Sequence, residues 1–192
     1  MLATMNRRAV YRLLDRTLIG VLFLLALILI GVTAARAGEI IPMVGMTRPV
    51  DGDDQSQISG GLALRGNLLP IIKTEIAASY RSDKFFNGDL EVRQWPVTAS
   101  LYLSPIPAIY AGGGVGWYHT SLDYADTVPL ASKTTEEFGV HVGGGLQVPI
   151  APAAAIDLGG RYVFMRDQES QLVPEKFNPD FWTTTLGLAI KF

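Results

Sequence analysis

The feature that most constrains the fold is an alternation of apolar and polar residues that runs from Gly38 to Phe192. The last twelve residues show it best, with Trp182, Thr184, Leu186, Leu188, Ile190 and Phe192 on one face and mostly small or polar residues on the other. Successive side chains of a β-strand point to opposite faces, so a period of two predicts strands. We expect eight strands, near residues 41–47, 57–66, 71–81, 90–103, 108–121, 135–148, 154–166 and 181–192.

The connections between these strands alternate between long and short. Long ones cover residues 48–56, 82–89, 122–134 and 167–180, and short ones cover 67–70, 104–107 and 149–153. Alternation alone fits a soluble sandwich as well as a membrane barrel. Long connections at one end and tight turns at the other, with strands near the ~9–11 residues of a tilted membrane crossing, favour an outer-membrane barrel. The expected fold is all-β, an eight-stranded antiparallel up-and-down transmembrane β-barrel.

The first 37 residues differ from the rest in charge and pattern. They contain five arginines and one acid, a charge of +4, and an apolar run of 15 residues from Leu18 to Val32. Ala35 and Ala37 are small residues at the positions that a signal peptidase reads, and Gly38 follows. This order predicts a cleaved helical signal peptide, residues 1–37, before a barrel domain, residues 38–192. The alternative is an uncleaved anchor helix, for which the run is short.

Composition excludes several function classes. The chain has no cysteine and two histidines, which argues against disulfide frameworks and Cys- or His-rich metal sites. Residues 38–192 carry 11 basic and 17 acidic residues, a net charge of −6, so a nucleic-acid partner has no electrostatic support. We expect no catalytic residues, no cofactor and no metal.

Aromatic residues cluster toward the ends of the expected strands. Girdles of aromatic side chains mark the two interfaces of membrane barrels. We expect an outer girdle of Tyr80, Trp95, Trp117, Tyr118, Tyr162, Phe164 and Trp182, and a periplasmic one of Tyr102, Tyr110 and Phe192.

Four segments carry a resemblance to a known family: QWPVTASLYL at 94–103, IYAGGGVGWY at 109–118, FGVHVGGGL at 138–146 and IDLGGRY at 156–162. With the terminal Phe192, they resemble the small eight-stranded outer-membrane barrels of the OmpA, OmpX and OmpW types. The resemblance implies location in the cell outer membrane, contact with lipid and lipopolysaccharide, and help from periplasmic chaperones and the barrel assembly machinery. It also implies that Phe192 is an assembly signal. We expect no peptidoglycan-tethering domain after the barrel, which departs from the OmpA type.

The polar face of the strands carries an unusual number of charges. They are Arg65, Lys73, Glu75, Glu137, His141, Asp157, Arg161 and Lys191. Side chains just fill the interior of an eight-stranded barrel, so these charges should pair within it. We expect Asp157 opposite Lys191, His141 opposite Arg161, and Arg161 within ion-pair range of Asp157, His141 or Glu137. The network is interpreted as a structural plug, with a gate or ion path as the alternative.

Three further motifs have a structural and a functional interpretation. The glycines of 112–116 lack the following helix that a phosphate-binding loop requires, so we expect them to lie beside the triplet 143–145 as space-making strand residues. His119 and Ser121 with Glu136–Glu137 resemble a Ser-His-acid set, but the Asn-rich segment of barrel lipid A deacylases is missing. Asp51–Asp54 matches only the start of a calcium loop.

The functional expectation is a non-enzymatic scaffold that presents four surface loops for envelope integrity, adhesion or surface interaction. One alternative is a narrow conduit for small or apolar solutes, which needs an open lumen or a lateral gap. The other is a lipid A-modifying enzyme, which needs a lipid-facing Ser-His-acid cluster. The surface ligand stays unknown at this point.

Overall fold

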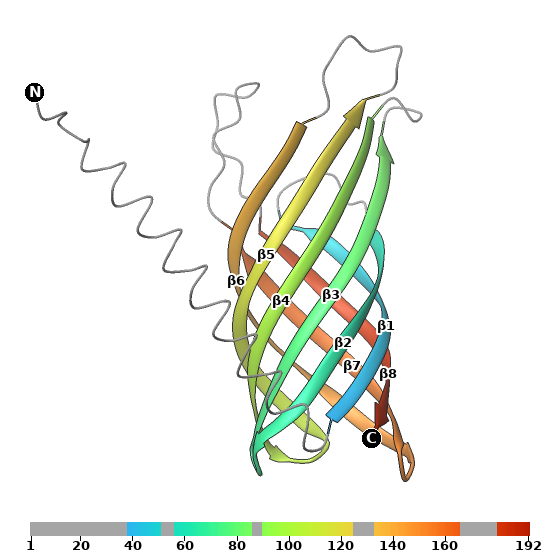
Figure 1. The fold of residues 1–192 in the computed structure, drawn as a ribbon, viewed down its shortest axis with the longest axis vertical. Helices are drawn as coiled ribbons and strands as arrows, with labels where there is room; N and C mark the ends of the chain where they lie inside the picture. The colour runs from blue at the N-terminus through green and yellow to red at the C-terminus, as the bar shows by residue number, and fades with distance from the viewer. Residues whose placement is uncertain (1–37, 51–55, 86–89, 125–132, 166–179) are drawn as a thin grey trace, which may run out of the picture.

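The computed structural model describes residues 38–50, 56–85, 90–124, 133–165 and 180–192, and these form a closed barrel of eight strands (Figure 1). The strands are β1 (Gly38–Pro49), β2 (Gln57–Leu69), β3 (Ile72–Phe85), β4 (Leu90–Ile106), β5 (Ile109–Tyr124), β6 (Lys133–Ala151), β7 (Ala154–Phe164) and β8 (Phe181–Lys191). Each strand pairs antiparallel with its neighbours in sequence, and β1 closes the barrel on β8. The predicted fold class is confirmed.

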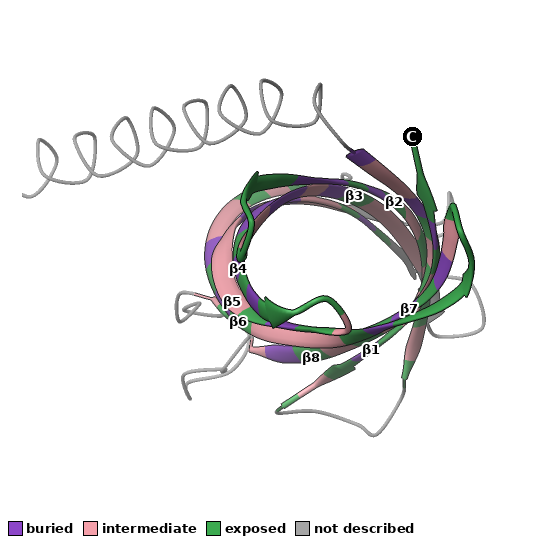
Figure 2. Ribbon diagram, turned by 90° about the horizontal axis from the view of Figure 1, so that it is seen from below, coloured by how far each residue is buried: buried purple, intermediate pink, exposed green. Residues whose placement is uncertain are grey.

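Alternation of side chains sets the two faces of the wall, as the alternating burial around the ring shows (Figure 2). On β8 the side chain of Trp182 is 56% exposed on the outside, whereas Ala189 is fully buried on the inside. The same outward row continues over β1, β2 and β4 to β7 as exposed Val, Leu, Ile, Met, Phe and Trp side chains. A continuous apolar exterior of this size is unfavourable in water and favourable in a bilayer, where closure also pairs every strand edge.

The two ends of the barrel differ in their connections. At one end, the short-turn end, two residues separate β2 from β3, β4 from β5 and β6 from β7. At the other, the long-connection end, the strands are of unequal height: β6 has 19 residues and β4 has 17, whereas β7 and β8 have 11 each. Strands β3 to β6 therefore rise above the rest of the rim as a one-sided wall (Figure 1).

An aromatic belt surrounds the outside toward the long-connection end. Tyr80 stacks on Trp95 with ring centroids 4.4 Å apart, and Tyr162 lies between Phe164 and Trp182 at 4.6 and 4.7 Å. Trp117 packs against His119 on the same outer face. These outward rings match the interfacial girdle of a membrane barrel.

Three of the residues expected in the girdles face the interior instead. Tyr102, Tyr110 and Tyr118 are each no more than 3% exposed. The expectation was wrong because it considered only the height of each residue along its strand. Tyr102 alternates in phase with the inward Ser100 and Ser104, and Tyr110 and Tyr118 share the inward face of β5. Of the expected second girdle, only Phe192 is on the outside, where it is 72% exposed.

Candidate functional site in the barrel interior

Near the short-turn end, one arginine is hydrogen-bonded to groups from three other strands, and a residue of a fourth strand joins the same network. Arg65 on β2 donates to Glu75 on β3 through Nε at 2.9 Å and Nη2 at 2.6 Å, and to Asp157 on β7 through Nη1 at 2.6 Å. Tyr110 on β5 donates to Asp157 at 2.8 Å, and Tyr102 on β4 donates to Glu75 at 3.3 Å. We call these five residues the Arg65 cluster. Its bonds span the barrel and tie opposite walls together.

A second arginine is bonded to the Arg65 cluster. Arg161 on β7 donates to Glu75 at 3.3 Å and to the hydroxyl of Thr98 at 3.1 Å. Two guanidinium groups thus face two carboxylates, and the Arg65 guanidinium also lies over the Tyr110 ring at 4.2 Å. Buried charges are tolerated only when paired and hydrogen-bonded, and this arrangement meets both conditions.

Glycines on β5, β6 and β7 make room for the tyrosines of the interior. A Cβ on Gly145 would collide with the phenol of Tyr110, and one on Gly116 would come within 2.7 Å of the Tyr118 ring. Gly139 would likewise approach the Tyr118 ring at 3.1 Å. Gly112 and Gly143 are direct partners in the β5–β6 ladder, as the side-by-side arrangement of the glycine runs predicts. Around the Arg65 cluster the remaining void is about 10 Å³, room for about one water.

Two of the expected charge pairs are wrong. Asp157 lies opposite Gly187, not Lys191, because the long connection before β8 puts no constraint on its register. His141 lies opposite Val163 rather than Arg161, because the turn between β6 and β7 has two residues instead of the five expected, which together with the bulge between Pro149 and Ala151 moves the pairing by two residues. The partners of Arg161 are Glu75 and Thr98 rather than any of the three acceptors expected.

The other predicted interior charges are spread along the barrel axis. At the short-turn end, Lys73 donates to Gln147 at 3.2 Å, and Gln147 donates to Glu39 at 2.7 Å. These residues line a vestibule of about 700 Å³, together with Lys191, which is exposed there. Glu137 lies on the inner face of β6 toward the other end, opposite Tyr118.

His141 lies between these regions and is 2% exposed. Its Nε2 is 2.9 Å from the hydroxyl of Ser100 on β4, while its Nδ1 has no hydrogen-bond partner among the described residues. Both side chains are buried in the barrel interior, so a substrate would reach this Ser-His contact only if the barrel opened.

Sequence reasoning missed three interior residues, namely Glu39, Tyr102 and Tyr110. The phase of alternation could have identified the two tyrosines, because each shares parity with inward residues of its own strand. Glu39 lies outside the strand expected at 41–47, so its face was not assigned.

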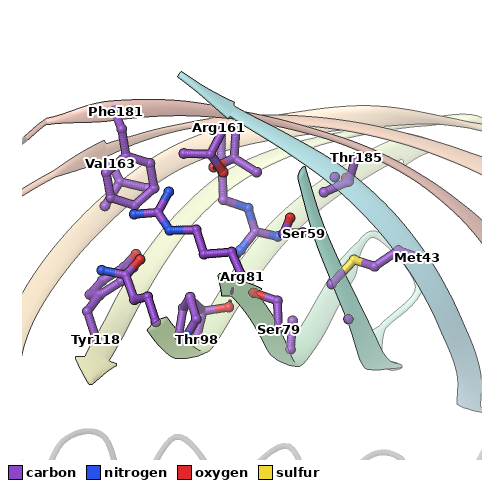
Figure 3. Close-up of a pocket in the computed structure, with 17 residues that line it drawn as sticks. Met43, Ser59, Ser79, Arg81, Thr98, Tyr118, Arg161, Val163, Phe181 and Thr185 are labelled. Atoms are coloured by element: carbon purple, nitrogen blue, oxygen red, sulfur yellow. Dashed lines mark hydrogen bonds between the residues drawn. The ribbon is translucent and has the colours of Figure 1, made fainter. Parts of the chain in front are cut away.

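Beyond the Arg65 cluster, toward the long-connection end, the interior contains a cavity of about 50 Å³. We call it the upper cavity, and Figure 3 shows residues that line it. Its lining includes hydroxyl side chains from β1, β2, β3, β4 and β8, the arginines Arg81 and Arg161, and the phenol of Tyr118. The Arg65 cluster separates this cavity from the vestibule.

The outer surface carries the His119 and Ser121 pair that the sequence singled out. Both lie on the outward face of β5, just beyond the aromatic belt. His119 Nδ1 is 3.6 Å from Glu136 Oε1 on β6, while the Ser121 hydroxyl is 3.4 Å from that of Thr134. The structure therefore pairs the histidine with an acid, and it directs the serine toward a threonine rather than toward His119.

Other predicted features cannot be placed on the barrel. The signal segment 1–37 and the acidic run 51–54 lie outside the described residues, as do most of the long connections. Within the described ranges, no three His, Asp or Glu side chains gather in a way that could hold a metal ion. No helix in this part of the chain is long and apolar enough to cross a membrane.

Comparison with solved structures shows the fold and no more. OprG from Pseudomonas aeruginosa matches with a TM-score of 0.58 and 16% identity over 81% of this chain and 96% of that one. Neisserial surface protein A matches with a TM-score of 0.57 and 14% identity over 81% and 96%. Ail, the attachment invasion locus protein of Yersinia pestis, matches with a TM-score of 0.56 and 15% identity over 81% and 98%.

No protein-family model matches the sequence, and no curated protein matches it. The architecture is that of the small eight-stranded outer-membrane β-barrels.

Proposed function

We propose that the protein is a non-enzymatic barrel of the outer membrane that anchors and presents its four long connections at the cell surface. The observation that carries the proposal is the closed interior, in which the Arg65 cluster leaves about 10 Å³ of void between vestibule and upper cavity. Paired charges that block the lumen make the barrel rigid and leave no path for a solute. The outward apolar band and the aromatic belt support the membrane location.

The conduit alternative is the less favoured one. A conducting lumen needs a continuous path of water, and the Arg65 cluster would have to break at least two guanidinium–carboxylate pairs to supply it. Planar-bilayer recordings of the folded full chain should show no steps in conductance. Stable single-channel openings with the native sequence would support the conduit in place of the scaffold.

Charge indicates what the presented connections bind. Segments 50–56, 86–89, 125–132 and 165–180, which connect the strands at this end, contain nine acidic and two basic residues, a net charge of −7. A solved complex of Ail contains a heparin analogue, sucrose octasulfate, which is a polyanion. The connections here have the sign that repels such a ligand, so we propose a basic partner surface instead.

The proposal of a basic partner can be tested with the full chain in lipid nanodiscs. The experiment compares its binding to a basic surface and to a sulfated surface. The protein should bind immobilised poly-lysine at low salt and fail to bind heparin. A variant with Asp167→Asn, Glu169→Gln and Glu175→Gln should bind poly-lysine more weakly, whereas the matched change Glu39→Gln at the opposite end should have no effect. Retention on heparin would contradict the proposed partner class without affecting the anchor function.

A second candidate is hydrolysis of outer-leaflet lipid, which the His119–Glu136 contact favours. Its chemistry needs a serine nucleophile activated by the histidine, and the Ser121 hydroxyl points to Thr134 instead. We therefore expect lipid A from cells expressing the native chain and the Ser121→Ala variant to have the same mass. Loss of an acyl chain in the native strain alone would establish the enzyme.

Export and assembly complete the proposal. We propose cleavage after Ala37, chaperone escort across the periplasm, and recognition of Phe192 by the assembly machinery. Deleting Phe192 should leave refolding into detergent nearly normal, because the ring is on the outside, while accumulation in the outer membrane falls. Equal losses in both settings would mean that Phe192 is only an interfacial anchor, and intact Met1 in purified membranes would contradict cleavage.

A further inference from the structure

We propose that the vestibule binds the headgroup of one anionic phospholipid from the leaflet at the short-turn end, with the lipid phosphate at Lys73 and Lys191. The inference rests on the proposed membrane location of the barrel and not on what the long connections bind. Three features support it: the depth of the vestibule mouth in the bilayer, the apolar turns around that mouth, and the two lysines inside it.

The mouth of the vestibule lies at the boundary of the apolar exterior. The aromatic belt, which includes Trp182 on β8, marks one boundary, and Phe192 beside the vestibule is ten residues further along the chain. At ~3.3 Å per residue and a tilt of about 40°, this stretch spans roughly 25 Å along the barrel axis. The apolar band of an outer-membrane barrel is also about 25 Å tall. The vestibule therefore opens at the level of the lipid headgroups.

The three turns around the mouth are apolar and carry no charge. They cover residues 67–71, 104–108 and 149–153, with the sequences NLLPI, SPIPA and PIAPA. Leu69, Ile106 and Ile150 are each more than half exposed, and Figure 2 shows exposed turns around the opening of this end. Turns that face water are normally polar, and a set of exposed apolar side chains marks a contact surface. At the depth of the headgroups, the surface that these turns contact is the lipid leaflet.

Inside the mouth, two lysines from β3 and β8 supply the positive charge that a phosphate group needs. Lys73 donates to Gln147 on the opposite wall, and an ammonium group has three N–H donors. Lys191 is exposed in the vestibule and has no hydrogen bond or ion pair within the described residues. Lys73 and Lys191 are within electrostatic range of each other, so a phosphate close to both relieves their repulsion.

Glu39 is the only carboxylate side chain among the described residues that line the vestibule. It accepts from Gln147 at 2.7 Å and is the cross-strand neighbour of Lys191 in the β1–β8 ladder. The side chains of the lining thus comprise two cations and one anion. This balance favours an anionic lipid such as phosphatidylglycerol over a zwitterionic one, and Glu39 can accept from the hydroxyl groups of the glycerol headgroup.

The size and lining of the vestibule favour a lipid over a soluble anion. Its volume of about 700 Å³ is in the range of sites for small molecules. The Arg65 cluster forms its floor, so a ligand enters and leaves only through the mouth. Leu68, Leu69 and Phe192 line that mouth, and they offer apolar contacts to the glycerol backbone and acyl chains that a free phosphate lacks.

The first experiment is native mass spectrometry of the folded full chain released from nanodiscs that contain equal amounts of phosphatidylglycerol and phosphatidylcholine. We expect one retained phosphatidylglycerol per chain. Lys73→Gln and Lys191→Gln should each weaken retention about tenfold, through loss of one charge-assisted contact. Lys133→Gln is the matched control, because it removes the same charge from the first residue of β6 at the opposite end. Equal retention of both lipids, or native retention in both vestibule variants, would overturn the proposal.

Inorganic phosphate tests the soluble source of the same chemical group. Added in molar excess at constant ionic strength, it should leave the retained phosphatidylglycerol in place, because it makes no contact with the apolar mouth. Displacement of the lipid by inorganic phosphate would assign the vestibule to a soluble anion and contradict the lipid.

The second experiment measures the depth of the turns in phosphatidylglycerol nanodiscs. The chain has no cysteine, so the variants Leu69→Cys, Ile150→Cys and Ser56→Cys each take a single spin label. Labels at the two turns should be more accessible to oxygen, which partitions into lipid, than to a water-soluble nickel complex. The label at position 56, near the opposite end, is the control and should show the reverse. Turn labels with the accessibility of this control would contradict contact with the leaflet.

Heat-modifiable gel mobility of each sample distinguishes failure of this inference from failure of the proposed function. A folded chain in lipid that retains no anionic lipid would overturn the vestibule site alone. A chain that does not fold into lipid would overturn the membrane location as well.

Discussion

The two halves of the barrel interior are built from the same parts and differ in how well their polar groups are satisfied. In each, a tyrosine of β5 lies on glycines of the β5–β6 pair and faces an arginine. Tyr110 bonds to Asp157 and Arg65, within a set of two arginines and two carboxylates. Tyr118 has no such bond among the described residues, and it lines the upper cavity with Arg81 and Arg161. The first arrangement closes the lumen, whereas the second leaves a cavity of about 50 Å³.

The largest loss of stability should come from a substitution in the half of the interior that contains the Arg65 cluster. Arg65→Ala leaves Glu75 and Asp157 buried without their main partner, which should lower the free energy of unfolding by about 3–5 kcal/mol. Urea titration in detergent, followed by heat-modifiable gel mobility, measures this loss. Arg93→Ala, an exposed position on the outer face, is the control and should change stability by less than about 0.5 kcal/mol. Equal stability of the two variants would mean a hydrated interior and would favour the conduit.

A smaller effect should follow from filling one glycine position under Tyr110. A methyl group at Gly145 would meet the phenol and the backbone carbonyl of Leu158, so Gly145→Ala should cost about 1–3 kcal/mol through overpacking. Gly60 is the matched control because a Cβ there meets nothing within 4 Å. Gly60→Ala should be neutral or slightly stabilising in the same urea titration. A loss shared by both variants would trace the effect to strand propensity rather than to the tyrosine.

The smallest and most specific effect compares the two tyrosines directly. Tyr110→Phe removes a hydroxyl that is bonded on both sides, and should cost about 1–2 kcal/mol. Tyr118→Phe removes a hydroxyl that has no partner among the described residues, and should leave stability nearly unchanged. Thermal unfolding of both variants in the same buffer distinguishes them. A comparable loss in Tyr118→Phe would show that the polar groups of the two halves are equally satisfied by protein or water.

The sequence allows the wall of the barrel to be predicted but not the contacts across its interior. Alternation is a local property, so the eight strands and the inward direction of Arg65, Glu75 and Asp157 follow from parity. Which inward groups meet depends on the stagger of all eight strands at closure, and no local pattern encodes it. The turn between β6 and β7 is shorter than expected, and the long connection before β8 does not constrain the register of that strand, so both expected pairs failed.

The position of the tyrosines could have been derived and was missed. Tyr102 alternates in phase with Ser100, and that parity places it inside whatever its height along the strand. The upper cavity is different, since it arises from Arg81 and Arg161 on strands far apart in the chain. Only the closed barrel brings them to one space.

The glycine positions beneath the tyrosines have a consequence for how β5 and β6 find each other during assembly. Glycine-rich strands have few side chains to distinguish one alignment from the next, so they tend to slip. Here a slip of two residues in one direction would move Tyr110 from Gly145 to face Gln147. A slip in the other direction would move the Tyr118 ring from Gly139 onto Glu137. Either error forces an aromatic ring onto a side chain. The two rings therefore disfavour the wrong β5–β6 registers by steric clash, even before the barrel has closed.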